Sequence, residues 1–381
     1  MYHQLLNAPG LIKHWQYLMV DIVVNHNAWS GAPDTVDYAN FNPFNSESYY
    51  HPYCSPDYGN ITSTEVCWQG DTTVPLPDLR TEDGDVASMY QDWIGQLVAN
   101  YSIDGIRMDT ALEVDPNFWA DFSEAAGIFI TGEVDDPPAS VVCPYQNYLD
   151  SVLNYPLYHL ATAAFTSTTG SISALVQGIN DVKADCKDST LLGSFTENHD
   201  QPRFAQQTED WSLAKNIIAF TILQDGIPII YEGQEQHYDS QGGIGIPFNR
   251  EAIWFSEYNT SAELYQHVKT LNAIRKRAIG QDDAYLTYKN WVTYNDSTII
   301  GMKKGSVITV LTNVGQDASS SSVTLESGST AFAANEQILE VIGCTILTTD
   351  GNADVVVPMN AGLPRVLYPL SGLSGSGICG Q

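Results

Sequence analysis

Four apolar runs in the sequence end on a carboxylate or carboxamide side chain that a buried strand does not need. The runs end at Asn25, Asp109, Glu133 and Asp200. Arg107 stands two residues before Asp109, so both side chains would point to the same side of an extended chain. A cation there keeps the neighbouring carboxylate ionised. Three acids, one of them beside an arginine, are residue types suited to nucleophilic and general acid–base chemistry.

Such acids can cooperate only if the fold brings the ends of their runs together. Apolar runs alternate with stretches of helical spacing, such as 86–99 and 212–224, and this alternation predicts a parallel sheet covered by helices. In a (β/α)₈ barrel the carboxyl ends of the strands open onto one cavity, where the three acids would meet. Cleavage of a glycosidic bond with retention requires such a set, with one ionised and one protonated carboxyl group. A helix cap or a surface charge is the ordinary explanation of one such acid, but not of the whole set.

Two segments depart from this alternation. Residues 26–79 are rich in Pro, Asn, Tyr and Ser and contain the first two cysteines, which predicts an inserted loop domain. After about residue 284, short runs rich in Thr, Val and Ser are separated by Gly and Asn, as in an antiparallel β-sandwich. We therefore expect a catalytic barrel domain over 1–25 and 80–283, an inserted domain over 26–79 and a C-terminal β-sandwich over 284–381.

Composition and charge narrow the classes of binding partner and the cellular compartments that are expected for this protein. The 381 residues carry a net charge of −29, which argues against nucleic acid or an anionic membrane as a partner and favours neutral ligands or bound cations. No segment reaches the length and apolarity of a membrane span. Six cysteines without zinc-type spacing, together with Asn-x-Ser/Thr sequons, favour an oxidising, secreted setting. The sequons lie at Asn60, Asn100, Asn259 and Asn295.

Four short motifs follow one another along the chain: DIVVNH at 21–26, GIRMDTALE at 105–113, GEV at 132–134 and FTENHD at 195–200. This ordered set resembles the motifs of fungal secreted α-amylases of glycoside hydrolase family 13, and the likeness runs from about residue 17 to the C-terminus. The resemblance implies retaining endo-hydrolysis of α-1,4-glucosidic bonds in starch- or glycogen-type glucans through a covalent glycosyl-enzyme intermediate. Two alternatives stay open: a 4-α-glucanotransferase that uses the same site, and an inactive, truncated glucan-binding paralogue.

The same resemblance implies a role for each matching residue. Asp109 becomes the nucleophile, Glu133 the general acid and then base, and Asp200 the carboxylate that holds the distorted sugar. Further residues match substrate contacts: Arg107, His26, His199, Tyr58 and Arg250. The expected partner is an α-glucan polysaccharide or a maltooligosaccharide, bound by a monomer.

The family also implies a calcium ion between the barrel and the inserted domain. Asn25 and Asp78 match its side-chain ligands, and the main-chain oxygens of Glu65 and Glu113 match the remaining protein ligands. An oxygen-only set drawn from distant segments suits Ca²⁺ rather than Zn²⁺. The implied disulfides are Cys54–Cys67, Cys143–Cys186 and Cys344–Cys379.

Three substitutions and the start of the chain depart from the family pattern. Leu112 and Glu113 stand where a lysine and a histidine contact the leaving-group side, and Ile246 replaces an aspartate on the opposite side. We expect altered sugar subsites around an intact catalytic trio. The first of six strand candidates aligns with the third barrel strand of the family, and residues 1–15 resemble neither the family nor a signal peptide. We therefore expect an N-terminally truncated chain that holds barrel strands three to eight of a secreted enzyme.

Overall fold

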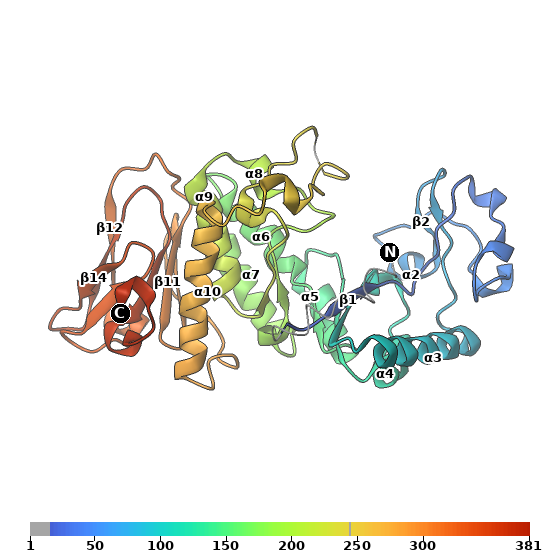
Figure 1. The fold of residues 1–381 in the computed structure, drawn as a ribbon, viewed down its shortest axis with the longest axis horizontal. Helices are drawn as coiled ribbons and strands as arrows, with labels where there is room; N and C mark the ends of the chain where they lie inside the picture. Colours follow the sequence, from blue (N-terminus) through green and yellow to red (C-terminus); the bar gives the residue numbers. More distant parts are fainter. Residues whose placement is uncertain (1–15, 244) are drawn as a thin grey trace. The chain divides into compact units, whose positions relative to one another are not determined.

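The computed structural model describes residues 16–243 and 245–381 (Figure 1). The chain divides into two compact units, and each is described by itself. The first contains Met1–Asp136 and Val141–Leu153, and the second contains Pro137–Ser140 and Asn154–Gln381. The division falls inside the predicted barrel domain rather than at its ends. The predictions for residues 1–15 lie outside the described residues.

The first unit is built on a parallel sheet in the order β1-β4-β5-β6. Its strands are β1 (Met19–Ile22), β4 (Gly105–Met108), β5 (Phe129–Gly132) and β6 (Ser151–Val152). All three neighbouring pairs are parallel, as the alternation of strands and helices predicts. The centre of β4 and β5 is apolar and fully buried at Ile106, Met108 and Ile130, so the strands lie in the core while their carboxyl ends carry the polar residues.

Two helices connect the strands of this sheet and pack against each other (Figure 1). They are α3 (Gly84–Tyr101) and α4 (Phe118–Ala126). In α4, Phe118, Phe122 and Ala126 recur at four-residue spacing and are buried, which defines its inner face. Gly127 ends α4 with φ 62°, a left-handed conformation that glycine adopts without a steric penalty. The other helix, α3, confirms the helix predicted over 86–99, with slightly wider bounds.

The inserted segment has little regular structure. It contains the short helix α2 (Ile61–Val66), the two-stranded pair β2 (Gln69–Gly70) and β3 (Pro75–Leu76), and three 3₁₀ turns, η2 (Pro33–Thr35), η3 (Tyr38–Asn40) and η4 (Glu47–Tyr49). The Cys54–Cys67 disulfide closes a loop around α2, as predicted. The rest of the first unit adds η5 (Ala111–Glu113) and η6 (Cys143–Asn147), and α5 (Ala139–Val142) precedes η6.

The second unit continues the alternation of strands and helices. The parallel strands β7 (Gly193–Ser194) and β8 (Ile227–Pro228) pair with each other. The accompanying helices are α6 (Tyr155–Phe165), α7 (Ile172–Asp185), α8 (Phe204–Gln207), α9 (Trp211–Leu223) and α10 (Glu263–Gln281), with 3₁₀ turns η7 (Ser189–Leu191), η8 (Gln234–Gln236) and η9 (Ile253–Ser256). Most of α9 is buried, so this helix forms the core of the unit, and it confirms the helix predicted over 212–224.

The C-terminal part of the second unit is antiparallel, as predicted. Six strands form one sheet in the order β14-β13-β16-β11-β10-β9, and β12 pairs with β15. The strands are β9 (Trp291–Asn295), β10 (Ile299–Lys304), β11 (Val307–Thr312), β12 (Ser321–Leu325), β13 (Gln337–Glu340), β14 (Thr345–Thr348), β15 (Val355–Met359) and β16 (Arg365–Pro369). Both sheets contribute to one apolar core, which includes Val310, Val323 and Leu367. The remaining elements are α11 (Ser327–Thr330), η10 (Leu370–Leu373) and η11 (Ile378–Gly380), and the predicted Cys344–Cys379 disulfide is formed.

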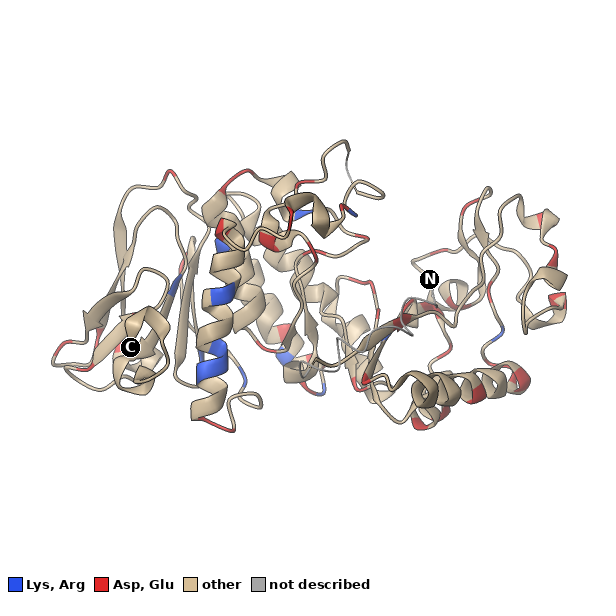
Figure 2. Cartoon of the chain, viewed as in Figure 1, with Lys and Arg blue, Asp and Glu red and all other residues tan. Residues whose placement is uncertain are grey.

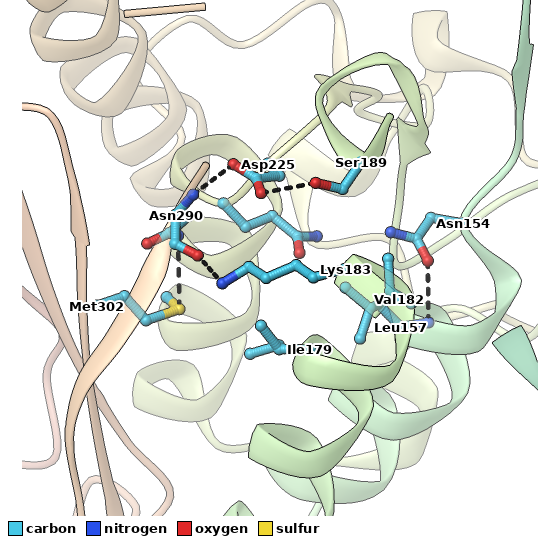
Figure 3. A pocket seen from close by; sticks show the side chains of 10 residues that line it. Asn154, Leu157, Ile179, Val182, Lys183, Ser189, Asp225, Asn290 and Met302 are labelled. Atoms are coloured by element: carbon cyan, nitrogen blue, oxygen red, sulfur yellow. Dashed lines mark hydrogen bonds between the residues drawn. The ribbon is translucent and has the colours of Figure 1, made fainter. Parts of the chain in front are cut away.

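A buried polar cluster joins this sheet to the helices of the second unit (Figure 3). Asp225 accepts hydrogen bonds from Ser189 Oγ at 3.0 Å and from the Asn290 backbone N–H at 2.7 Å. Lys304 Nζ of β10 lies 3.0 Å from the same carboxylate, and both side chains are nearly excluded from solvent. Lys183 Nζ donates to the carbonyl of Asn290. The segment that enters β9 is therefore held in place from two sides.

Candidate active site

Arg107 gathers the strand-end acids of the first unit. Its Nη1 lies 2.9 Å from Asp21 Oδ1 and 2.5 Å from Asp109 Oδ1, and its Nη2 lies 2.8 Å from Glu133 Oε1. The Arg107 side chain is 12% exposed and that of Glu133 is 10% exposed, so these pairs are largely shielded from water. The predicted contact between Arg107 and Asp109 is therefore present, and the same guanidinium also binds Glu133.

The register of the parallel strands and one strained turn produce this arrangement. Asp21 of β1 lies directly opposite Arg107 of β4. Just after Asp109 the chain turns at Thr110, which has φ 50°, a conformation that is uncommon for a residue with a branched side chain. The Thr110 backbone N–H then donates to Glu133 Oε2 at 3.1 Å. The turn after β4 thus fixes the carboxylate at the end of β5.

Electrostatics favour an ionised Arg107 at this site. Burial alone would lower the pKa of the Arg107 guanidinium, but the charges of Glu133, Asp21 and Asp109 raise it above its usual range. His26 follows Asn25 at the end of the first strand segment. Burial lowers the pKa of the His26 imidazole, with Asp109 acting in the opposite direction. A neutral imidazole at this place can donate and accept hydrogen bonds, as contact with sugar hydroxyls requires.

Asp200 belongs to the second unit, where it is the centre of another cluster. Its Oδ1 lies 2.9 Å from Arg250 Nη2, and its Oδ2 lies 3.1 Å from His199 Nε2. Arg250 also donates from Nε to the carbonyl of His199 at 2.9 Å. The carboxamide of Asn198 accepts hydrogen bonds from the backbone N–H groups of Asp200 and Gln201. Three predicted site residues, His199, Asp200 and Arg250, thus form one hydrogen-bonded group.

A buried arginine that the sequence patterns did not single out supports this group. Arg203 is fully buried, with Nη1 3.3 Å from Glu197 Oε2 and Nε 3.1 Å from Glu251 Oε2. Its guanidinium carbon lies 4.2 Å from the ring centroid of Tyr231, and Nη1 donates to the carbonyl of Glu232 at 2.7 Å. Glu251 directly follows Arg250, and Glu197 comes three residues before Asp200. Arg203 therefore connects the two segments that supply the Asp200–Arg250 pair.

The predicted calcium ligands are placed by the loop segments of the first unit. Asn25 and Asp78 are both buried, and the Asn25 carbonyl accepts from the Leu79 backbone N–H at 2.8 Å. Asp78 Oδ1 lies 2.7 Å from His51 Nδ1. Asp78 Oδ2 is buried without a hydrogen-bond partner among the described residues, so an oxygen that a cation could use is present. No group of three His, Cys, Asp or Glu side chains in the described ranges could hold a metal, which is compatible with a set that relies on an amide and main-chain oxygens.

The residues that depart from the family pattern differ from one another in how far they are buried. Leu112 is only 8% exposed, and its carbonyl accepts from Tyr145 Oη at 3.3 Å. Burial raises the pKa of the Glu113 carboxyl to about 8, with the charge of Glu133 acting in the same direction. Tyr58 is 68% exposed and Ile246 is 54% exposed, so both can meet a ligand from solvent.

Two further observations concern the state of the cysteines and the length and polarity of the helices. Cys143 and Cys186 are disulfide-bonded, so in the described part of the chain no cysteine is free. Within residues 16–243 and 245–381, the helices are too short or too polar to cross a membrane.

Comparisons with known proteins identify the family. The model of the alpha amylase catalytic domain matches residues 13–295, and the model of alpha-amylase domain C matches residues 292–381. The chain belongs to the alpha-amylase family. It is 45% identical to Alpha-amylase 2 of Schwanniomyces occidentalis over 374 residues, which cover 97% of this chain and 72% of that protein. It is 53% identical to Alpha-amylase 1 of Lipomyces kononenkoae over 375 residues, which cover 98% of this chain and 60% of that protein.

A solved structure extends the likeness to the fold. The alpha-amylase from Malbranchea cinnamomea superposes with a TM-score of 0.93 at 46% identity, covering 97% of this chain and 77% of that one. The fold is therefore that of the TIM-barrel amylases with a C-terminal antiparallel domain C. As a member of this family the chain is a glycoside hydrolase of the α-amylase type, whose reaction is the endo-hydrolysis of α-1,4-glucosidic bonds.

Proposed function

We propose that this chain cleaves internal α-1,4-glucosidic bonds of starch- or glycogen-type glucans with retention, using Asp109 as nucleophile and Glu133 as acid and then base. The observation that carries this proposal is the single guanidinium of Arg107, which contacts both carboxylates. A retaining hydrolase needs two carboxyl groups close together with opposite roles. The shared guanidinium holds both carboxylates and turns them towards the same space.

The bond changes follow from these two roles. Asp109 attacks the anomeric carbon, and Glu133 gives its proton to the departing glycosidic oxygen, so a covalent glycosyl-enzyme forms as the leaving chain is released. Glu133 then removes a proton from water, which attacks the same carbon and frees Asp109. The hydrogen bond from the Thr110 backbone N–H to Glu133 Oε2 leaves the carboxyl group positioned beside the nucleophile throughout.

Asp200 is assigned to holding the sugar rather than to proton transfer. Its carboxylate already accepts from Arg250 and lies beside His199, so these two partners hold it in place. A fixed negative charge of this kind stabilises the positive charge that develops on a sugar ring in an oxocarbenium-like transition state. His26, His199, Tyr58 and Arg250 are the proposed contacts to the glucan.

Calcium is the proposed ion of the inserted segment, held by Asn25, Asp78 and the main-chain oxygens of Glu65 and Glu113. When bound, a calcium ion would cross-link the end of the first strand to the inserted loop. The buried Asp78 Oδ2, which has no hydrogen-bond partner among the described residues, supports an oxygen-binding cation. An extracellular, monomeric enzyme is proposed as well, since its cysteines are disulfide-bonded and its net charge of −29 opposes self-association.

Product analysis with maltooligosaccharides tests this function. Hydrolysis of maltoheptaose should give shorter products that first appear as the α-anomer, and the Asp109→Asn variant should bind but not cleave this substrate. Products longer than the donor would assign the chain to glycosyl transfer instead. Binding without any turnover by the unsubstituted chain would contradict the enzymatic proposal.

A further inference from the structure

The residue before Arg250 carries a carboxamide that binds the backbone on both sides of Asp200. Asn249 is fully buried, and its Nδ2 donates to the carbonyl of His199 at 3.0 Å and to the carbonyl of Gln201 at 2.9 Å. Only the NH₂ group of a carboxamide can donate to two carbonyls, so these contacts determine which way the side chain points. One side chain therefore holds the residue before Asp200 and the residue after it.

Asp200 depends on such contacts because no regular element holds its backbone. It lies between the end of β7 and the start of α8, outside both. The backbone N–H groups of Asp200 and Gln201 donate instead to the carboxamide oxygen of Asn198. The neighbouring carbonyls accept from the carboxamide of Asn249. Two carboxamides, one accepting and one donating, thus satisfy the backbone here as a helix or a strand would elsewhere.

Asn249 is itself held through its backbone and its neighbours. Its carbonyl accepts from Tyr231 Oη at 3.1 Å, and its N–H donates to the carbonyl of Gly245 at 3.0 Å. Glu251, two residues further on, is paired with the buried Arg203, and the Tyr231 ring lies against the same guanidinium. The segment that carries Asn249 is therefore anchored independently of the residues that its side chain binds.

The oxygen of the same carboxamide has no comparable contact. Asn249 Oδ1 is buried without a hydrogen-bond partner among the described residues. Because a buried acceptor without a partner is unfavourable, an apolar side chain would fill this space without that penalty. Within the described part of the chain, the side-chain hydrogen bonds of Asn249 all go to the backbone around Asp200.

A neutral side chain suits this place because it orients Asp200 without adding charge. The chain has 45 Asp and Glu residues against 16 Lys and Arg, and Figure 2 shows several of these cations along α10. Arg250 already contacts the Asp200 carboxylate and offsets part of its negative charge. A further cation would weaken the field that stabilises a positive sugar ring, whereas the amide of Asn249 carries no net charge.

We propose that Asn249 is a positioning residue, which holds the backbone around Asp200 so that the carboxylate meets the positive charge of the transition state at the correct distance. This role rests on the proposed function, in which Asp200 stabilises that charge. A displacement of about 1 Å can lower a rate about a hundredfold. Because the Asp200 charge acts most strongly in the transition state, loss of the Asn249 contacts should lower kcat more than it raises KM.

Replacing Asn249 with leucine removes both donors with little change in volume. We expect kcat on maltoheptaose to fall about tenfold to a hundredfold, with KM nearly unchanged. Asn313→Leu is the matched control, because Asn313 is also fully buried, donates from Nδ2 to two carbonyls and leaves Oδ1 without a partner among the described residues. Its partners are Ala164 and Gly170, which have no part in the proposed site. The control should lose similar stability in thermal melting but keep its kcat.

Removal of the Asp200 carboxylate distinguishes positioning from a structural role. In an Asp200→Asn background, Asn249→Leu should lower kcat no further, because a residue that acts through that carboxylate has nothing left to position. If Asn249→Leu does not fold, Asn249→Ser, which keeps one donor, is measured against the same two criteria. A kcat equal to that of Asn313→Leu, or the same loss of kcat with and without the Asp200 carboxylate, would overturn the role of Asn249. An unsubstituted chain that leaves maltoheptaose intact would instead contradict the proposed function, and this role with it.

Discussion

Replacing Arg203 with methionine should destabilise the protein strongly, because it leaves the buried Glu197 carboxylate and the largely buried Glu251 carboxylate without their cation. Arg203 is fully buried, and its nitrogens lie 3.3 Å from Glu197 and 3.1 Å from Glu251. At an effective dielectric constant near 20, each pair corresponds to about 5 kcal/mol of gross attraction. Desolvation of the ions offsets much of this sum, and removal of one partner of a buried pair typically costs about 3–5 kcal/mol. We expect a loss of about 4 kcal/mol.

The pH dependence of that loss gives a sharper test. Burial raises the pKa of Glu197 to about 7 from its usual 4.5, with Arg203 acting to lower it. The folded state therefore binds this proton more tightly than the unfolded chain, and the resulting stability is present below about pH 4.5 and lost as pH rises through 7. Without Arg203 the folded pKa rises further, so the loss continues to higher pH. The destabilisation should thus be larger at about pH 8.5 than at about pH 6 by about 1.4 kcal/mol per additional pKa unit.

Urea unfolding followed by tryptophan fluorescence measures both effects. Arg80→Met is the matched control, because Arg80 pairs with Asp83 at 2.8 Å but its side chain is 38% exposed. An exposed pair contributes at most about 1 kcal/mol. Adding Glu197→Gln to the Arg203→Met variant should restore part of the lost stability, since one unpaired carboxylate is removed. A cost for Arg203→Met no larger than that of Arg80→Met, or one that does not change with pH, would refute the reasoning.

Three further predictions concern the catalytic pair, the cation and a disulfide. Asp109→Asn and Glu133→Gln should each lower kcat on maltoheptaose by about a thousandfold or more while binding by calorimetry persists; near-normal turnover in either variant would exclude its assigned role. EDTA should lower the melting temperature in calorimetry, and Asp78→Ala should abolish most of that difference, so equal EDTA sensitivity of the two proteins would show that Asp78 holds no ion. Replacing both Cys54 and Cys67, whose disulfide spans 13 residues, with serine should lower the free energy of unfolding in urea by about 3 kcal/mol. An unchanged unfolding midpoint would indicate that the loop is ordered without the disulfide.

The catalytic chemistry could be predicted from the sequence because its signals are local. Arg107 and Asp109 are two residues apart on a strand, so strand periodicity alone places them together, and the structure confirms their contact. The same holds for the helices over 86–99 and 212–224, whose apolar spacing marks their buried faces. Likewise His199 and Asp200 are adjacent in the chain and act as neighbours in the fold.

Other features depended on partners that only the tertiary structure brings together. Glu251 is 48 residues from Arg203, and Lys304 is 79 residues from Asp225, yet each pair is in contact and largely shielded from water. A sequence pattern records which residues are apolar or charged, but it does not record which distant segment excludes water from them. Trp291 is the clearest case: in sequence it is one more aromatic residue, and only the fold places it, exposed, at the start of the edge strand β9 with Lys183 of α7 over its ring. The spacing of residues in the sequence therefore determined which acids could act and which strands and helices carry them. The tertiary structure decided, through burial and long-range pairing, which charged side chains hold those acids in place.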